Sequence, residues 1–92
     1  MQEPLVSILI PFKNAAQYLH ECIQSILDQT YTNWEVLAVD DHSTDESGEV
    51  MASFAKEDTR IQVFQNQGQG IIHALRMAYE KSSGKFITRM DS

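Results

Sequence analysis

Apolar residues occur along this chain in two patterns, short continuous runs and longer stretches with apolar residues three or four positions apart. The continuous runs are Leu5–Ile10, Trp34–Val39, Arg60–Phe64 and Phe86–Met90. Short runs rich in aliphatic and β-branched residues, bounded by turn residues, predict buried strands. Pro11 directly follows the first run and predicts that this strand ends at Ile10.

The longer stretches predict a helix between each pair of strands. Their apolar faces are Leu19, Cys22, Ile23, Ile26 and Leu27, then Ser47, Val50, Met51 and Phe54, then Ile71, Ala74, Leu75, Ala78 and Tyr79. Asn14 is the expected N-cap of the first helix, and Ser43 with Glu46 forms the capping-box pattern before the second. Gly84 is a plausible C-terminal cap of the third.

The resulting order β-α-β-α-β-α-β predicts an α/β fold. Strands that alternate with helices favour a three-layer, doubly wound and mostly parallel sheet, the Rossmann-like arrangement, with right-handed connections. The chain of 92 residues has no repeat or linker, so residues 1–92 are interpreted as one domain.

Composition and charge limit the binding partners and the cellular compartment that we expect for this chain. The net charge of -6, with no basic stripe, disfavours nucleic acid. A single cysteine, Cys22, excludes an internal disulfide, and its place on an apolar helix face predicts a buried reduced thiol. The first residues lack a basic leader and the apolar runs are short, so we expect neither a signal peptide nor a membrane span.

Candidate chemistry lies where the predicted strands end, since parallel sheets bind ligands at the carboxyl ends of their strands. Asp40 and Asp41 follow the second strand and Asp91 follows the fourth. Like charges this close repel, and a divalent cation is the simplest group to offset them. Asp and Asn are also turn formers and helix caps; that interpretation is favoured for Ser43 and Asp45 and stays open for Asn14.

Other ligand motifs are incomplete. The segment GQGIIH has His73 in place of the third glycine of a dinucleotide fingerprint, and no GxxxxGK[ST] phosphate loop exists. His20, His42 and His73 lack metal-ligand spacing and are interpreted as surface or packing residues. A receiver domain would need an aspartate after the third strand, where this chain has Gln65 and Asn66.

Three blocks, VSILIPFKN, CIQSILDQTYTNWEVLAVDDHSTDES and GKFITRMDS, together resemble the N-terminal part of family-two glycosyltransferases, which are inverting enzymes of the GT-A fold. The resemblance extends from Val6 to Ser92. The closing TRMDS resembles members in which the last strand enters an acid-x-acid metal motif. By this resemblance Asp91 is the first acid of that motif, and the chain is expected to stop inside it.

The resemblance implies roles for individual residues. The implied nucleotide-binding residues around the base and ribose are Pro11, Phe12, Lys13 and Asn14, and Asp41 would bind the base itself. Asp40 would support that loop. Asp91 would bind the nucleotide through Mg²⁺ or Mn²⁺ at the diphosphate. The base in this family is most often uracil. The catalytic carboxylate base belongs to the family's C-terminal half, so no catalytic residue is expected in this chain, and the chain alone is expected to be inactive.

The implied reaction transfers a sugar, with inversion, from a nucleotide-sugar to the hydroxyl of a saccharide or lipid-linked acceptor. We expect a UDP-sugar donor and a role in polysaccharide or glycolipid synthesis. The expected location is cytoplasmic, peripheral to the membrane's inner face in a longer protein. The alternative is a non-catalytic nucleotide-binding or interaction module of the same fold. A nucleotidyltransferase is disfavoured because no glycine- and basic-rich phosphate loop follows the first strand.

Three positions depart from the family pattern, and one strand is expected to be exposed. Lys13 stands where many relatives have Tyr, His42 replaces a common Gly, and Arg76 falls where relatives often have Asn. A positive φ at His42 would be tolerated at some cost. The fourth strand is expected at a sheet edge, where it could pair with another chain and form a homodimer.

Overall fold

The computed structural model describes residues 3–90 and contains four strands that alternate with three helices. In chain order the elements are β1 (Val6–Phe12), α1 (Ala16–Asp28), β2 (Trp34–Asp40), α2 (Ser47–Glu57), β3 (Ile61–Gln65), α3 (Ile71–Lys81) and β4 (Phe86–Arg89). The strands form one sheet in the order β3-β2-β1-β4, and every neighbouring pair is parallel. The predicted element order and parallel sheet are confirmed.

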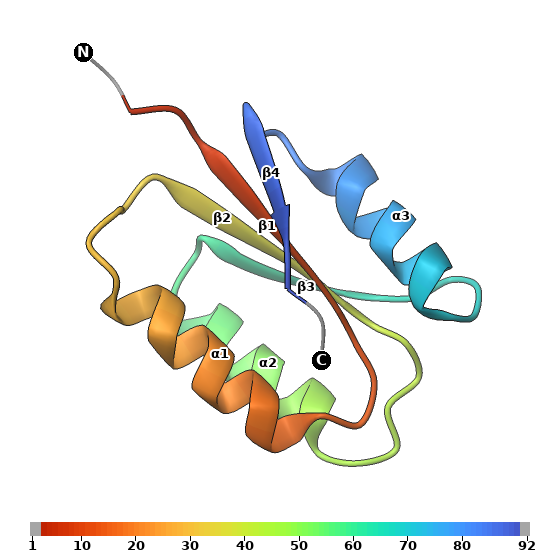
Figure 1. Ribbon diagram of the computed structural model, residues 1–92. Coiled ribbons are helices and arrows are strands. Elements are labelled where there is room, and N and C mark those ends of the chain that lie inside the picture. Colours follow the sequence, from red (N-terminus) through yellow and green to blue (C-terminus); the bar gives the residue numbers. More distant parts are fainter. Residues whose placement is uncertain (1–2, 91–92) are drawn as a thin grey trace.

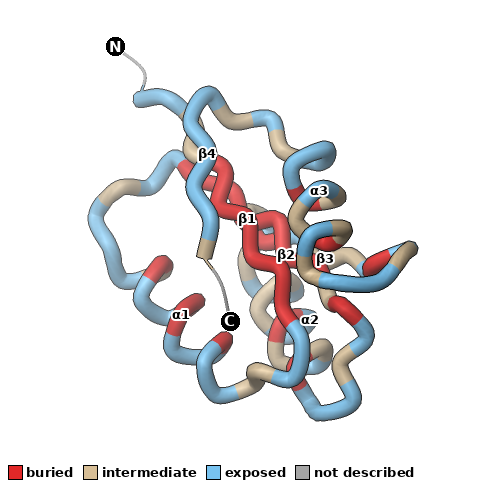
Figure 2. The backbone as a smooth tube through the Cα atoms, turned by 45° about the vertical axis from the view of Figure 1, so that its right-hand side comes forward, coloured by how far each residue is buried: buried red, intermediate tan, exposed pale blue. Residues whose placement is uncertain are grey.

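Helices cover both faces of the sheet, with α1 and α2 on one face and α3 on the other (Figure 1). The larger core cluster joins β1, β2 and Ile61 to α1 and α2, and a smaller one places Leu9, Leu37 and Val39 against Ala74 and Ala78 of α3. Because β1 and β2 are buried from both faces (Figure 2), their sequences are mostly apolar rather than alternating, with Ser7 and Glu35 as buried polar exceptions. This arrangement confirms the doubly wound fold.

The strand order reverses beside β1. From β1 the chain proceeds outward through β2 to β3, and α3 then carries it back to β4 on the other side of β1. In open α/β sheets, the crevice beyond the carboxyl ends of the strands at such a reversal is where ligands bind. The residues that follow β1, β2 and β3 are therefore candidates for a ligand-binding site.

Strand β1 continues through Pro11 to Phe12, two residues beyond the predicted end at Ile10. The carbonyls of Leu5 and Leu9 accept hydrogen bonds from β4 residues, so odd-numbered positions of β1 face β4. The nitrogen of Pro11 points to the same side, beyond the last pairing of β1 with β4 at Leu9 and Arg89. A proline there removes no hydrogen bond from the β1–β2 ladder, which runs to Phe12.

All three predicted caps are wrong. The N-cap residue of helix α1 is Ala15 rather than Asn14, and it makes no side-chain capping hydrogen bond. Helix α2 begins after Glu46, also without a side-chain cap, so Ser43 and Glu46 form no capping box. Helix α3 ends at Lys81 with Ser82 as its C-cap, two residues before Gly84. A Cβ on Gly84 would lie 2.5 Å from Ser7 Oγ, so this glycine serves close approach of the β4 segment to β1.

A buried carboxylate joins the turn before β4 to the centre of the sheet. Glu35 Oε2 on β2 accepts the hydroxyl of Ser7 at 2.6 Å and the N–H of Ser83 at 2.7 Å. Ser7 Oγ in turn accepts the N–H of Gly84 at 2.8 Å. Glu35 is 9% exposed, and its hydrogen-bonded partners are all donors, as an ionised carboxylate requires. This network fixes where β4 starts beside β1.

Strand β4 lies at the edge of the sheet, as predicted, and is exposed along its length. Phe86 and Ile87 are 55% and 43% exposed. Cys22 is buried on α1 beside Met90, and burial raises the pKa of its thiol, which fits the predicted packing role. Among residues 3–90, no helix has both the length and the apolarity that crossing a membrane requires.

Candidate functional site

Asp41 lies at the carboxyl end of β2 and is 5% exposed. Its backbone N–H donates to the carbonyl of Phe12 at 2.8 Å, which extends the β1–β2 pairing by one step. Its carboxylate oxygen Oδ1 accepts the side-chain amide of Asn66 at 2.9 Å and the N–H of Gly70 at 3.0 Å. Both donors bond the same oxygen, Oδ1, so the carboxylate is held in one orientation. The second carboxylate oxygen, Oδ2, is its other hydrogen-bond acceptor.

Asn66 connects Asp41 to the loop between β3 and α3. Its side chain is 2% exposed, and its backbone N–H donates to the carbonyl of Asp40. Besides bonding Asp41, its Nδ2 donates to the carbonyl of Gly70 at 3.2 Å. Its Oδ1 accepts the N–H of Gly68 at 3.0 Å and lies 2.5 Å from Nδ1 of His73. One asparagine therefore holds both the loop and the Asp41 carboxylate.

A cavity of about 410 Å³ opens between the loops that follow β1, β2 and β3. Its lining residues are Lys13, Asp41, His42, Gln69 and Gly70. His42 has a φ of 61°, which confirms a positive φ at the position where relatives often have glycine. Its Nε2 lies 2.7 Å from the carbonyl oxygen of Gly68, and because a carbonyl can only accept, Nε2 carries the proton. The cavity is thus walled by three loops that are hydrogen-bonded to one another.

The two adjacent aspartates serve different loops. Asp40 Oδ1 accepts the N–H of Ser43 at 2.8 Å, and a Cβ on Gly48 would lie 2.9 Å from its Oδ2, so this carboxylate lies against the first turn of α2. Asp41 instead bonds the loop before α3. N–H donors bind each of these two carboxylates, and the predicted offset by a divalent cation, which includes Asp91, stays a prediction. Asp40 bonds its own loop at Ser43, and its role at a nucleotide site also stays a prediction.

The metal prediction rests on Asp91, which lies outside the described residues. Within residues 3–90, no group of three or more His, Cys, Asp or Glu side chains is arranged to hold a metal ion.

The four residues after Ile10 lie in different surroundings. Pro11 and Phe12 are among the fully buried side chains, and Phe12 packs in the cluster with α1 and α2. In this conformation neither side chain lines the cavity, contrary to the predicted role around the base and ribose. Lys13 does line it, and Asn14 lies beside it in an exposed loop.

Asn14 joins the loop after β1 to the loop after β2. With a φ of 50°, it places Oδ1 where it accepts the N–H groups of Thr44 at 2.7 Å and Asp45 at 3.2 Å. Next to it, the N–H of Ala15 donates to Ser47 Oγ at 2.7 Å. The Ser47 hydroxyl, and then the Ser47 N–H, bond the Asp45 carboxylate and lower its pKa. Asn14 and Asp45 therefore have structural roles that hold the cavity's outer loops together.

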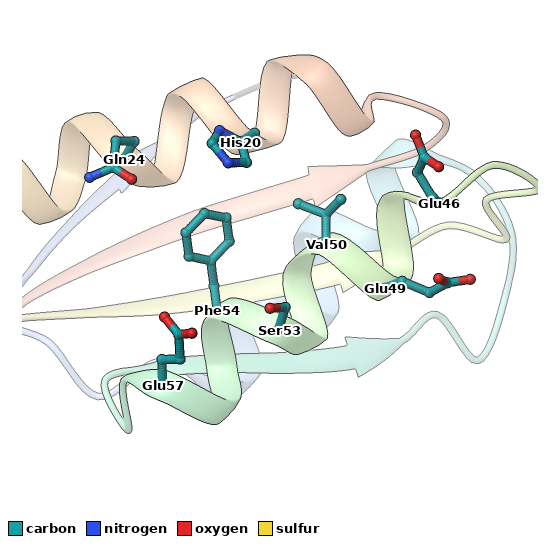
Figure 3. Close-up of a pocket in the computed structure, with 8 residues that line it drawn as sticks. All are labelled: His20, Gln24, Glu46, Glu49, Val50, Ser53, Phe54 and Glu57. Carbon is teal, nitrogen blue, oxygen red and sulfur yellow. The ribbon is translucent and has the colours of Figure 1, made fainter.

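A larger cavity of about 550 Å³ lies between α1 and α2 (Figure 3), and Asp41 is not among its lining residues. His20 and Phe54 meet across it with ring centroids 5.6 Å apart, and Glu46, Glu49 and Glu57 line it from α2 and its N-cap. It contains no residue from the ends of the strands. Surface acids along one helix are an ordinary solvated face, so we assign no function to this groove.

No role in orienting Asp41 is predicted from the sequence for Asn66, Gly70 or His73. These residues belong to the segment NQGQGIIH, whose last six residues form only an incomplete dinucleotide fingerprint. One signal was available, since an amide side chain directly after a strand lies at the edge where ligands bind. Its partner could not be predicted, because Asp41 is 25 residues away along the chain.

Comparison with known families shows what this arrangement is similar to. A family model described as glycosyl transferase family 2 matches residues 7–92. The chain is 40% identical over 89 residues to the glycosyltransferase GlyG of Streptococcus pneumoniae, covering 96% of this chain and 30% of GlyG. It is 35% identical over 91 residues to the putative teichuronic acid biosynthesis glycosyltransferase TuaG of Bacillus subtilis, covering 98% of this chain and 36% of TuaG.

Solved structures share the fold. The mannosyltransferase PcManGT from Pyrobaculum calidifontis, in complex with GDP-Man and Mn²⁺, superposes with a TM-score of 0.85 at 25% identity over 98% of this chain and 28% of that chain. S. aureus TarS 1-349 in complex with UDP gives a TM-score of 0.84 at 25% identity over 95% of this chain and 27% of that chain. This chain thus spans about a third or less of the length of these proteins.

Proposed function

Because the chain belongs to glycosyl transferase family 2, we propose that it forms the nucleotide-binding part of an inverting glycosyltransferase that uses a UDP-sugar. The sugar would pass to the hydroxyl of a saccharide or lipid-linked acceptor, in polysaccharide or glycolipid synthesis. TuaG, named for teichuronic acid biosynthesis, supports that class of product. The reaction would occur in the cytoplasm, with the longer protein peripheral to the membrane.

The observation that carries the proposal is the fixed carboxylate of Asp41 at the wall of the 410 Å³ cavity. An ionised carboxylate only accepts hydrogen bonds. It therefore favours a base with a donor at the centre of its pairing edge, such as the N3–H of uracil or the N1–H of guanine. Cytosine and adenine present an acceptor at that point and are disfavoured. The UDP bound to TarS and the GDP-Man bound to PcManGT both carry bases of the favoured kind.

Lys13 lines the same cavity and is exposed, so its ammonium is available to the diphosphate. Asp91 would help to hold Mg²⁺ or Mn²⁺, and the Mn²⁺ in PcManGT supports this assignment. When bound, such a cation stabilises negative charge on the departing nucleoside diphosphate. The residues described here would bind and orient the nucleotide; we assign the base that deprotonates the acceptor hydroxyl, and the acceptor site, to none of them.

The proposal is tested by thermal unfolding of the chain with UDP, GDP and ADP, each with and without Mn²⁺. A ligand at a hundredfold its dissociation constant stabilises the folded state by about 2.7 kcal/mol. We expect UDP to raise the melting temperature more than GDP does, and ADP to have no effect. An equal shift with all three nucleotides would contradict the role of Asp41 in selecting the base.

We also propose that β4 pairs with β4 of a second copy to form a homodimer. Support comes from its unpaired edge and from the exposed Phe86 and Ile87. Light scattering over a wide concentration range is expected to show a mass that rises towards the dimer. Ile87→Lys, which adds a charge to the strand, should shift the mass towards the monomer. A constant monomer mass for the unaltered chain would refute this interface.

A further inference from the structure

The hydrogen bonds around Asp41 continue to a half-buried histidine that the proposed function does not use. The chain of contacts runs from His73 on α3, through Asn66 after β3, to Asp41 after β2. We infer that Asn66 and His73 are positioning residues of the nucleotide site, which set the orientation of the Asp41 carboxylate and so its choice of base. This inference rests on the proposed function and names two further residues for it.

The directions of these hydrogen bonds follow from the partners. Nδ2 of Asn66 faces two acceptors, the Asp41 carboxylate and the Gly70 carbonyl. Its Oδ1 faces the N–H of Gly68, which is a donor. The amide therefore has one favourable orientation, and its Oδ1 needs a donor from the His73 ring, whose Nδ1 lies 2.5 Å away. His73 must carry its proton on Nδ1 when it is neutral.

A reversed Asn66 amide would be unfavourable because this residue is buried. Asn66 is 2% exposed, so water cannot replace a lost partner without opening the loop. A reversed amide would direct Oδ1 at the Asp41 carboxylate and Nδ2 at the N–H of Gly68, two mismatched contacts. The His73 ring also fills the space beside Gly68, where a Cβ would lie 2.9 Å from it. His73 therefore stabilises both the amide and the loop that includes the cavity residues Gln69 and Gly70.

A first experiment requires no ligand. The tautomer of His73 can be determined from nitrogen chemical shifts in ¹⁵N-labelled protein, at a pH where the ring is neutral. We expect the proton on Nδ1 for His73 and on Nε2 for His42, whose Nε2 faces the carbonyl of Gly68. A His73 that carries its proton on Nε2 would overturn the inference, whether or not the chain binds nucleotides.

A second experiment compares two replacements of His73. In His73→Phe the ring remains but the donor is lost, whereas in His73→Asn the side-chain Nδ2 takes the place of the ring donor. We expect the ratio of UDP to CDP affinity to fall about fivefold in His73→Phe and to stay near the wild-type value in His73→Asn. Asn66→Asp, which replaces a donor with a second carboxylate, is expected to lower UDP affinity at least about tenfold.

The matched control is His20→Phe, because His20 lies on α1 against Phe54 and away from the site. Thermal unfolding of each variant confirms that it is folded before affinities are compared. A UDP to CDP ratio unchanged in both His73→Phe and Asn66→Asp would overturn the positioning role while leaving the proposed function intact. A wild-type chain that binds no nucleotide would instead overturn the proposed function, and with it any role for these residues at a nucleotide site.

Discussion

Replacing Asp41 with asparagine is expected to invert the base preference of the chain, from UDP towards CDP. Asn66 and Gly70 both donate to Oδ1 of Asp41, so in Asp41→Asn they would hold the amide oxygen at that position. The new NH₂ group then takes the place of Oδ2 and offers a donor where the carboxylate offered an acceptor. Cytosine has an acceptor at N3 where uracil has a donor, so the variant fits the other pyrimidine.

Titration calorimetry with UDP and CDP measures this change. We expect the UDP affinity of Asp41→Asn to fall about 10- to 100-fold, the effect of losing a hydrogen bond to a charged group, while the CDP affinity rises. Asp28→Asn is the matched control, because it makes the same change in an exposed residue at the end of α1. A UDP to CDP ratio in Asp41→Asn equal to that of the control would show that Asp41 does not contact the base.

Replacing Glu35 with alanine is expected to cause a large loss of stability. The substitution leaves the hydroxyl of Ser7 and the N–H of Ser83 without their acceptor at the base of β4. The buried Ser7 hydroxyl without its acceptor costs on the order of 1–3 kcal/mol, and the lost bond to the exposed Ser83 adds less, so we expect a loss of roughly 3 kcal/mol. In a domain of this size that lowers the melting temperature by about 12–24 °C.

Denaturant unfolding measures the free energy of unfolding directly, and two further variants serve as references for Glu35→Ala. Glu35→Gln keeps an acceptor oxygen and is expected to lose about 1 kcal/mol. Glu21→Ala removes an exposed glutamate of α1 and is expected to change stability by less than about 0.5 kcal/mol. If Glu35→Ala were as stable as Glu21→Ala, the network would contribute nothing to placing β4.

The family and the fold were predictable because both depend on local patterns. Strands such as Trp34–Val39 are apolar apart from Glu35, and helices such as α1 repeat their apolar positions at helical spacing, so the alternating order was evident from the sequence. Alternation of strands and helices nearly determines a parallel, doubly wound sheet. The exposed edge position of β4 followed from the same order and is confirmed.

The parts that sequence reasoning missed depend on contacts between distant segments. Asn14 has the residue type of a helix cap, but its acceptor oxygen bonds the loop at Thr44, 30 residues away. Phe12 was expected at the ligand because of its position in a motif, yet its large apolar side chain is fully buried. Asn66 was overlooked because its role exists only once β3 lies beside β2. The predicted role of Asp91 in metal binding stays a prediction.

The most direct test of the account compares the binding of UDP with that of its N3-methyl derivative to the unaltered chain. Methylation removes the one donor that the base offers to Asp41 and leaves the ribose and the diphosphate intact. We predict that the methylated nucleotide binds about 10- to 100-fold more weakly than UDP. Equal affinity for the two nucleotides would contradict the claim that the Asp41 carboxylate recognises the base.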